Sequence, residues 1–403
     1  MKKNKFENST ATHNWDRSGL PGWTYFSEQL FDLEKDLLFK SCWQFVCHVN
    51  ALEEVGSFFT IDIADERGFV LRGTDKNLRA FHNLCPHRGS RVLAEKSGRC
   101  NKSIICPYHG WAFNFDGSLR GIARKDTFPD LNPDNLGLKP LEMEIWNGFI
   151  FVKFKKSNQA SVKNIMARFD KEIAPYNLKT MVPVKGSEWS EIVYANWKSV
   201  RDVDNEGYHV RQAHPGLHEL YGQNYFDEPF EDGTSRSVGI FNKKPSLRWS
   251  VRNYLKFLPN DTHLPSERRD RWTYAGMFPN LVFGFYPDCV IYYLEVPLSA
   301  TKTLQRGGVL RFADETRNLR VSRYLSGRID RDTAKEDQML TIWSCEATKS
   351  SAYTGVILSD LEYGVKTYHD HLRKLMPVLQ LNSEPAGGRL ADVNAEMLFE
   401  LQG

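Results

Sequence analysis

The chain has 403 residues, of which 41% are hydrophobic and 26% are charged, the balance of an ordinary globular protein. This composition excludes a disordered chain, a collagen-like fibre and a membrane-embedded protein. The 53 Lys and Arg exceed the 50 Asp and Glu by only 3, too few to favour a nucleic acid or an anionic membrane as partner. At about 150 residues per domain, the length predicts two or three domains.

Cysteine usage indicates a reducing environment. There are seven cysteines, an odd number in a long chain, and the first residues lack the apolar stretch of a signal peptide. We therefore expect a cytoplasmic protein without a disulfide framework. The most apolar segment, residues 281–296, contains Pro287, Asp288 and Glu295 and is short for a membrane span. Clustered cysteine and histidine side chains are accordingly interpreted as metal ligands.

The first part of the chain reads as a helix followed by short strands. Towards the end of the first forty residues, an amphipathic helix is predicted from apolar residues at helical spacing, Leu30, Leu33, Leu37 and Leu38. Apolar residues then alternate with polar ones or form short runs, which predicts strands at residues 57–63 and 69–71.

Two further signals close this first part. Asp116-Gly117 lies between apolar flanks, as in a tight hairpin. The polar residues 155–159, after a last predicted strand, are interpreted as a linker. We therefore predict a small all-β domain over residues 43–155. The segment before it, residues 1–42, is expected to pack on the larger domain formed by residues 156–403.

The second part, residues 156–403, mixes helices and strands. Residues 196–213 read as one helix, whereas residues 281–296 read as strand. Ser359 and Glu362 have the spacing of a capping box that opens a further helix. An antiparallel sheet covered by helices accommodates this mixture, and the fold class predicted for the chain is α+β.

Two loops each hold one cysteine and one histidine: Cys85-Pro-His87 and, 18 residues later, Cys106-Pro-Tyr-His109. Zinc-finger-like sites usually pair cysteine with cysteine and histidine with histidine, so a structural zinc ion is kept only as the alternative. One thiolate and one imidazole per loop suit a [2Fe-2S] cluster with two cysteines on one iron and two histidines on the other. The loops, each followed by glycine, resemble the Rieske iron–sulfur motif.

A second group of metal-binding residue types lies in the segment from Glu206 through His209 and His214 to Pro215. Two histidines and a distant carboxylate make the facial triad of a non-haem iron(II) oxygenase. Residues five apart on an ideal helix point about 140° apart. We therefore expect the helix to end near His214, where the following proline disfavours helical geometry.

This spacing, with the Rieske-like loops, resembles the large (α) subunit of Rieske-type ring-hydroxylating oxygenases over roughly residues 20–375. The resemblance implies that His209 and His214 bind a mononuclear Fe(II) and that a carboxylate of a downstream acidic pair completes the site. Asp337 is the expected ligand and Glu336 the fallback. The resemblance also implies that the [2Fe-2S] cluster is held by Cys85, His87, Cys106 and His109.

In this family a carboxylate joins a cluster histidine of one subunit to an iron histidine of the next, in head-to-tail trimers. The resemblance implies that Glu206 forms this bridge for electrons between His109 and His209. A homotrimer or a dimer of trimers is therefore expected, with or without a β subunit. Asp202, one helical turn before Glu206, is a further candidate for the surroundings of the iron.

The resemblance implies an enzyme, the terminal oxygenase component of a multi-component system that uses O2 on a small organic substrate. No glycine fingerprint for flavin or nicotinamide follows a predicted strand. NAD(P)H is therefore expected to act only through a partner, either a flavin and iron–sulfur reductase or a reductase plus a ferredoxin. A Rieske electron-transfer protein without oxygenase activity is the distant alternative, and it would have no use for three iron ligands.

Position 206 departs from the commonest family pattern, which has aspartate there. Glutamate resembles the members that act on quaternary ammonium compounds, such as carnitine oxygenases, whose hydroxylated product falls apart to an aldehyde and an amine. We therefore favour a quaternary ammonium or N-methyl substrate with C–N cleavage. Mono- or dihydroxylation of an aromatic ring or aromatic carboxylate is the alternative.

A cationic head group would need an aromatic cage, and a substrate carboxylate would need a partner such as Arg211. The aromatic residues that are candidates for the pocket are Tyr221, Tyr225, Phe226, Phe283, Phe285, Tyr286, Tyr292 and Tyr293. Because side chains alternate along a strand, Phe283 and Phe285 are expected on one face and Tyr286 on the other.

Overall fold

The computed structural model describes residues 14–128, 131–132, 135–259 and 263–402. The chain divides into two compact units. The smaller unit comprises Lys35–Ala167 and Leu178–Pro183, and the larger unit comprises the remainder. The domain boundaries expected from the sequence, at 42/43 and 155/156, stay a prediction.

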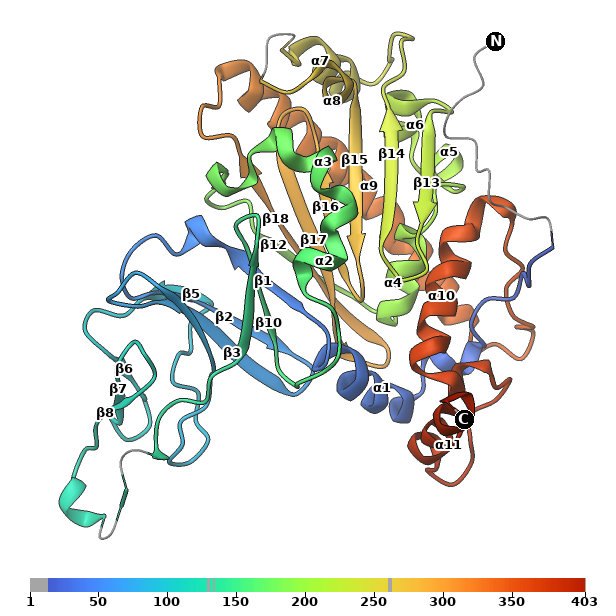
Figure 1. Ribbon diagram of the computed structural model, residues 1–403. Coiled ribbons are helices and arrows are strands. Elements are labelled where there is room, and N and C mark those ends of the chain that lie inside the picture. The colour runs from blue at the N-terminus through green and yellow to red at the C-terminus, as the bar shows by residue number, and fades with distance from the viewer. Residues whose placement is uncertain (1–13, 129–130, 133–134, 260–262, 403) are drawn as a thin grey trace. The chain divides into compact units, whose positions relative to one another are not determined.

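The smaller unit is built from three small antiparallel sheets (Figure 1). Their strand orders are β1-β10-β9, β4-β3-β2-β5 and β6-β7-β8. The strands are β1 (Gln44–His48), β2 (Ser57–Ile63), β3 (Glu66–Arg72), β4 (Leu78–His82), β5 (Ser97–Arg99), β6 (Ile104–Ile105), β7 (Ala112–Phe113), β8 (Leu119–Gly121), β9 (Glu142–Trp146) and β10 (Phe149–Lys153). This unit also contains the short helix α2 (Val162–Met166).

The alternating residues of the first predicted strands do form β2 and β3, which pair with Phe59 opposite Val70. The turn at Asp116 and Gly117 joins β7 to β8, and Gly117 has a φ of +89°, which a residue without Cβ adopts at little cost. The core beneath these strands contains Phe69, Trp111 and Phe113, each at most 2% exposed.

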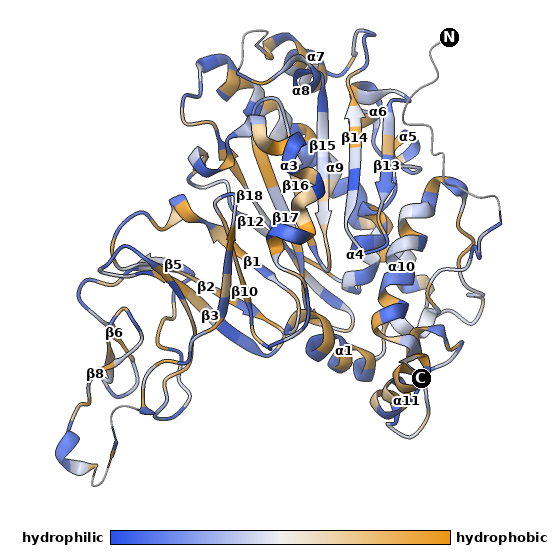
Figure 2. Cartoon of the chain, in the orientation of Figure 1, coloured by the Kyte–Doolittle hydropathy of each residue, from blue (hydrophilic) through white to orange (hydrophobic). Residues whose placement is uncertain are grey.

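The larger unit is organised around an antiparallel sheet with the strand order β18-β17-β16-β15-β14-β13, and β12 also pairs with β18. Figure 2 shows apolar residues concentrated on the central strands β16 and β17 and hydrophilic ones on the edge strand β13. The strands are β12 (Trp189–Val193), β13 (Tyr225–Pro229), β14 (Ser235–Ile240), β15 (Arg271–Met277), β16 (Leu281–Phe285), β17 (Val290–Ser299) and β18 (Lys302–Arg311).

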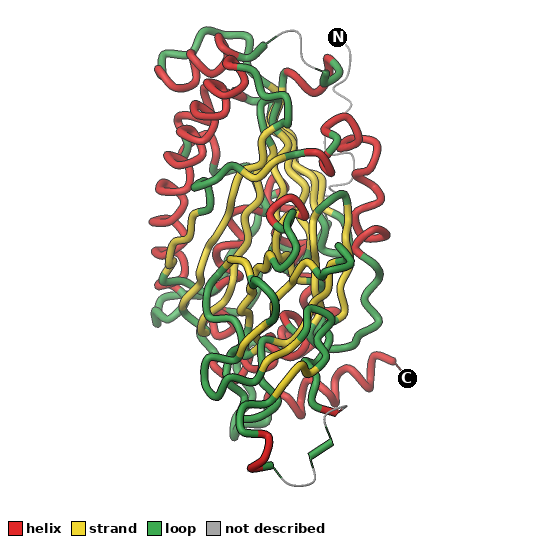
Figure 3. The backbone as a smooth tube through the Cα atoms, turned by 90° about the vertical axis from the view of Figure 1, so that its left-hand side faces the viewer, coloured by secondary structure: helices red, strands yellow, loops and turns green. Residues whose placement is uncertain are grey.

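Helices cover this sheet. The long helix α9 (Arg317–Ala347) runs along one side of the strands in Figure 3 and packs against α4, α6 and α7. The other helices of the larger unit are α1 (Glu28–Glu34), α3 (Asp170–Ile173), α4 (Trp197–Asp204), α5 (Val210–Ala213), α6 (Pro215–Tyr221), α7 (Trp249–Phe257), α8 (Ser266–Arg269), α10 (Tyr363–Leu375) and α11 (Leu390–Gln402). The predicted α+β class, a small all-β part and a larger antiparallel sheet covered by helices, is confirmed.

The single helix predicted over residues 196–213 is wrong, because the chain leaves helical geometry between α4 and α5. The side chain of Glu206 accepts the backbone N–H groups of Tyr208 and His209. These bonds compete with the helical hydrogen-bond ladder. The segment predicted as strand over 281–296 is a hairpin of β16 and β17, and the capping box of Ser359 and Glu362 is confirmed at the turn that leads into α10.

No helix among the described residues is long and apolar enough to cross a membrane.

A buried ion pair joins the first helix of the larger unit to the helix that leads to Glu206. Nζ of Lys198, at the start of α4, lies 2.5 Å from Oε1 of Glu34 in α1, and both side chains are fully buried. The indole Nε1 of Trp197 donates to the other carboxylate oxygen at 2.8 Å. Burying a charge costs free energy that only such pairing offsets, so each partner depends on the other.

Replacing Glu34 by alanine should leave the Lys198 ammonium buried and unpaired. We expect the free energy of unfolding to fall by about 3–5 kcal/mol, measured by urea denaturation of the full chain. Glu396→Ala is the control, because its pair with Arg389 is solvent-exposed and should contribute little. Equal unfolding midpoints for the two variants would contradict the role assigned to the Glu34 carboxylate.

Candidate functional site

Two loops of the smaller unit have the same backbone geometry. In the first loop, the backbone carbonyl of Cys85 accepts the N–H of Gly89 at 2.9 Å. In the second loop, the backbone carbonyl of Cys106 accepts the N–H of Gly110 at 3.0 Å. Both glycines have a φ of +71°, a left-handed conformation that favours glycine. The sequence spacing thus folds into two equivalent tight turns, each with a cysteine at its base and a histidine near its tip.

The turns bring both cysteines and both histidines together. Cys85 and Cys106 are buried, at 2% and 3% exposure, whereas His87 is half-buried and His109 is exposed. The two imidazole rings lie 4.7 Å apart between centroids, and Trp111 stacks on His87 at 5.0 Å. Burial raises the pKa of the Cys85 thiol, and the nearby backbone N–H groups of His87 and Arg88 act in the opposite direction. Two buried thiols and two imidazoles nearer the solvent fit a [2Fe-2S] cluster of mixed ligation.

Asn83 holds the first of these loops, a role that the sequence reasoning missed. The side chain is fully buried; its Oδ1 accepts the N–H groups of Val92 and Leu93, and its Nδ2 donates to the Leu93 carbonyl. These bonds tie together the two ends of the loop that contains Cys85 and His87. No sequence spacing marks an asparagine that holds a neighbouring ligand loop, so this role is visible only in the folded structure.

A second group lies within the larger unit, where one ligand atom from each of His209, His214 and Asp337 lies within 4.8 Å of the others. Nε2 of His209 is 3.0 Å from Nε2 of His214. Oδ1 of Asp337 is 2.8 Å from Nε2 of His214 and 3.5 Å from Nε2 of His209. His214 is 1% exposed, and the other two are partly buried. We call these three residues the trio.

The backbone explains how residues five apart come to face each other. Helix α5 ends at Ala213, and His214 has φ −117° and ψ 80°, outside helical geometry. Pro215 then starts α6 at its first position, where a backbone N–H would have no partner within the helix. The expected bend at His214 therefore occurs, and it turns the two imidazoles towards Asp337 on α9.

Two glutamates hold the far sides of the imidazole rings. Oε1 of Glu206 lies 2.5 Å from Nδ1 of His209, and Oε2 of Glu336 lies 2.9 Å from Nδ1 of His214. Each carboxylate fixes its ring with Nδ1 protonated, which leaves the lone pair of Nε2 for a metal. Glu336, the fallback ligand of the sequence analysis, thus lies against the outer side of a histidine rather than inside the trio.

Charge in the trio is arranged for a cation. Burial lowers the pKa of His209, but the carboxylates of Asp337 and Glu206 outweigh burial and raise it to about 10. Burial would raise the pKa of Asp337, yet the two imidazoles beside it hold this pKa below its usual range.

The trio fits a mononuclear iron. Oδ1 of Asp337 is buried and lacks a partner in hydrogen-bond geometry, although two Nε2 atoms lie close to it. An orphaned carboxylate oxygen that converges with two imidazole nitrogens is the donor set of a facial triad, which leaves the other metal positions open.

The structure does not bring Asp202 to the trio. Its carboxylate accepts the Tyr25 hydroxyl at 2.7 Å and lies 2.8 Å from Nε2 of His369. Asp204, two residues further along α4 and therefore on the other side of the helix, lines the cavity at the trio instead. Its Oδ1 accepts the hydroxyl of Tyr293 at 3.1 Å.

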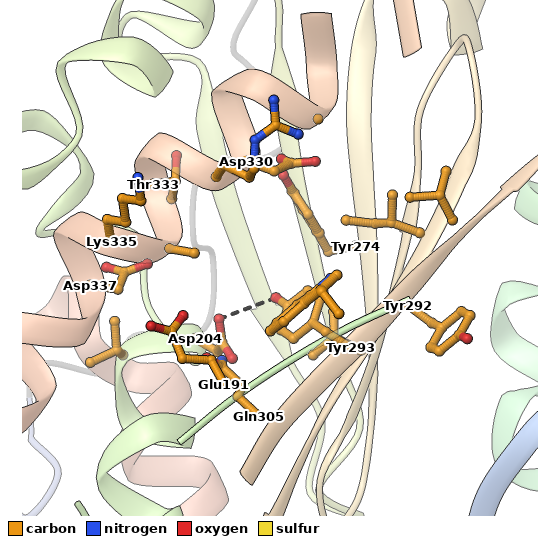
Figure 4. Close-up of a pocket in the computed structure, with 18 of the residues that line it drawn as sticks. Glu191, Asp204, Tyr274, Tyr292, Tyr293, Gln305, Asp330, Thr333, Lys335 and Asp337 are labelled. Carbon is orange, nitrogen blue, oxygen red and sulfur yellow. Dashed lines mark hydrogen bonds between the residues drawn. The ribbon is translucent and has the colours of Figure 1, made fainter. Parts of the chain in front are cut away.

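A cavity of about 960 Å³ lies beside the trio, between α4, α9 and the sheet. Its wall includes all three trio residues and Glu206. Figure 4 shows Asp337, Lys335 and Asp330 on α9, with Tyr274 and Tyr293 of the sheet across from them. The tyrosines that line the cavity are Tyr225, Tyr274, Tyr286, Tyr292, Tyr293 and Tyr324.

Of the pocket candidates from the sequence, Tyr225, Tyr286, Tyr292 and Tyr293 line the cavity. Tyr286 lines the cavity and Phe283 and Phe285 do not, as the alternation predicts. Tyr221 and Phe226 also lie outside the lining, and Arg211 is exposed and away from it. Tyr274 and Tyr324 line the cavity but were not among the candidates. Tyr274 lies on a strand and Tyr324 on a helix, and nothing in the sequence distinguished them from other tyrosines on such elements.

Sequence models of two domains match the chain. The Rieske [2Fe-2S] domain matches residues 42–132, and the ring hydroxylating alpha subunit (catalytic domain) matches residues 178–378. A carnitine monooxygenase oxygenase subunit from Acinetobacter pittii is 33% identical over 281 residues, which cover 70% of this chain and 72% of the relative. A glycine betaine monooxygenase oxygenase subunit from Chromohalobacter salexigens is 36% identical over 244 residues, 59% of this chain and 53% of the relative.

Solved structures agree on the fold. The quaternary ammonium Rieske monooxygenase CntA, in complex with L-carnitine, superposes with a TM-score of 0.72 at 25% identity, over 91% of this chain and 96% of CntA. Naphthalene 1,2-dioxygenase with bound indole has a TM-score of 0.71 at 18% identity, over 95% of this chain and 96% of the dioxygenase, which shows a common fold.

These matches establish the class of enzyme and its cofactors. Proteins of this class use a Rieske [2Fe-2S] cluster, a mononuclear non-haem iron, O2 and electrons from a partner reductase. The expected oxidoreductase that incorporates O2 is therefore confirmed, and an electron-transfer protein without oxygenase activity is excluded. The chain belongs to the Rieske-type ring-hydroxylating oxygenases, as the α subunit that serves as terminal oxygenase.

Proposed function

We propose that this oxygenase hydroxylates a carbon bonded to the nitrogen of a quaternary ammonium compound, and that the product then falls apart to an aldehyde and an amine. The observation that carries the proposal is glutamate rather than aspartate at position 206, held against Nδ1 of His209. The similarity to carnitine and glycine betaine monooxygenase oxygenase subunits supports the same substrate class.

In this proposal His209, His214 and Asp337 hold the mononuclear iron. An Fe(II) ion bound there would supply the chemistry that activates O2 for hydroxylation of a C–H bond. Glu206 and Glu336 keep both Nδ1 atoms protonated, so that both Nε2 atoms stay directed at the metal position. The surrounding cavity holds the substrate next to that position.

Cys85, Cys106, His87 and His109 are proposed as the ligands of the [2Fe-2S] cluster. Burial of the two cysteines keeps the thiolates away from water, whereas the exposed ring of His109 places an imidazole at the surface of the smaller unit. An exposed ligand edge is where an electron enters or leaves a cluster without crossing the protein core.

The same residues are the basis for a proposed bridge between subunits. We propose that Glu206 of one copy joins its own His209 to His109 of a neighbouring copy in a homotrimer. We further propose an electron donor that is a flavin and iron–sulfur reductase or a reductase plus ferredoxin. We also propose a cytoplasmic location, which is supported by the observation that none of the seven cysteines forms a disulfide.

The first test is a single turnover. The purified oxygenase, with its cluster pre-reduced, is given O2 and separate betaines, N-methylated amino acids and aromatic acids. We expect an aldehyde and a shortened amine from a quaternary ammonium compound, identified by mass spectrometry. A phenol or cis-diol from an aromatic acid, with betaines untouched, would refute the proposed substrate class.

Asp337→Ala should remove the mononuclear iron and spare the cluster. We expect a loss of about one iron per chain, because two imidazoles alone hold Fe(II) weakly, with an unchanged [2Fe-2S] spectrum. Iron analysis measures the iron content, and the absorption spectrum of the same sample measures the cluster. The exposed Asp332→Ala on the same helix is the control. Full iron content in Asp337→Ala would show that this carboxylate is no ligand.

Glu206→Gln should separate electron transfer from metal binding. The amide cannot act as the anionic bridge, so we expect both metal sites to fill and product formation to fall about 100-fold. The rate at which the reduced cluster is reoxidised by O2 and substrate, followed by absorption, should fall in parallel. Glu228→Gln, an exposed carboxylate of β13, is the control. Normal turnover in Glu206→Gln would contradict the bridge.

A further inference from the structure

One face of helix α9 carries both a trio residue and a second cavity-lining carboxyl. Asp330 and Asp337 both line the cavity. They are seven residues apart, so they lie on the same face of the helix about 10 Å apart along its axis. Gly327, one turn before Asp330, also lines the cavity.

Asp330 is a carboxyl without a cation. Tyr286 donates its hydroxyl to Oδ1 of Asp330 at 3.0 Å. No Lys, Arg or His among the described residues forms an ion pair with it within 4.0 Å, whereas Asp204, another carboxyl of the cavity wall, lies 3.6 Å from Arg201. Burial raises the pKa of Asp330 to about 8, and Asp288 adds to this while Arg331 opposes it. A partly buried carboxyl that no cation neutralises gains most from a cation brought by a ligand.

Tyrosines form a corner beside this carboxyl. Tyr274 and Tyr286 line the cavity with their rings 5.8 Å apart at 83°, and their hydroxyls lie 3.1 Å apart. Tyr286 is held by Trp272, which stacks on it at 3.9 Å. Tyr274 is partly exposed, whereas the ring of Tyr286 is 1% exposed and supports the corner from behind. An aromatic ring beside a carboxyl suits a rounded organic cation, which aromatic rings attract within about 6 Å.

Arg331 supplies the opposite charge beyond the carboxyl. It lines the cavity, and its Nη1 lies 3.7 Å from the position that a Cβ on Gly327 would take. The guanidinium therefore reaches back along α9, away from Asp337. From the metal position outwards, the cavity thus presents the trio, then an unpaired carboxyl, then a guanidinium about one helical turn further, roughly 5 Å along the axis.

We propose that Asp330 is the counter-ion of the substrate's ammonium group and that Arg331 binds a substrate carboxylate. A betaine then lies along α9 with an N-bonded carbon directed at the trio. This inference rests on the proposed function and adds the two residues that select the substrate. The adjacent ammonium and carboxylate subsites favour a zwitterion with few carbons between its charges.

The test is equilibrium binding to the iron-loaded enzyme without O2, measured by calorimetry. The probes are trimethylammonioacetate and trimethylammoniobutanoate, each paired with its neutral-headed carbon isostere, 3,3-dimethylbutanoate or 5,5-dimethylhexanoate. We expect the wild type to bind the ammonium member of a pair at least 10-fold more tightly. Asp330→Asn should weaken that member about 30-fold and leave the isostere almost unchanged. Asp330→Glu should restore part of the difference, and the exposed Asp332→Asn should preserve it.

The outcomes separate the two proposals. If the wild type prefers the ammonium probes and Asp330→Asn retains that preference, Asp330 is not the counter-ion and the proposed function stands. If the wild type binds both members of each pair equally, or binds neither, the substrate class itself is wrong.

Arg331→Gln keeps the inference testable should Asp330→Asn fail to fold, because Arg331 is exposed. We expect it to weaken both members of each pair by the same factor, since both carry a carboxylate. Unchanged affinity, or weaker binding of the ammonium member alone, would overturn the assignment of Arg331.

Discussion

Two imidazole nitrogens and a carboxylate oxygen point at the same small space in the interior of the larger unit, and much of that unit is arranged around this convergence. The carboxylate oxygen has no hydrogen-bond partner among the described residues. Lone pairs directed at one another repel, so a positive charge has to lie among them, either a proton on an imidazole, as the raised pKa of His209 indicates, or a metal ion. Glu206 and Glu336 preserve it from outside by fixing the rotation of the two rings.

The backbone departs from regular structure where this convergence requires it. The loop from Asn205 to His209 and the bend at His214 interrupt what would otherwise be one continuous helix. The carboxylate of Glu206 both ends the helical hydrogen-bond ladder and meets the ring of His209. One side chain thus shapes the loop and positions a ligand, so a change of Glu206 would alter both the loop conformation and the orientation of His209.

Local signals in the sequence were sufficient for the parts of the protein whose geometry is local. The tight turns at Cys85 and Cys106 and the bend before Pro215 depend on residues that are neighbours in the chain. The side of a helix on which a given residue lies relative to the cavity was harder to predict. Asp202 and Asp204 differ by about 200° around α4, and only the packing of α4 tells which of them faces the cavity.

Contacts between distant segments explain what the sequence could not reveal. Glu336 and Asp337 are adjacent, so only the position of His214 against α9 shows that one lies at Nδ1 and the other at Nε2. Asn83 and Asp330 belong to residue types that are usually solvated on a surface. Their importance arises from a loop and a sheet that fold over them.

The continuity of α9 constrains how such a cavity changes in evolution. Its 31 residues form one helix without a break, and a single face of it carries both a trio residue and much of the cavity wall. Inserting or deleting one residue within it would rotate all wall positions beyond that point by about 100° relative to Asp337. Relatives with new preferences should therefore differ along this helix by exchanges of side chains, while gaps in an alignment collect in the loops.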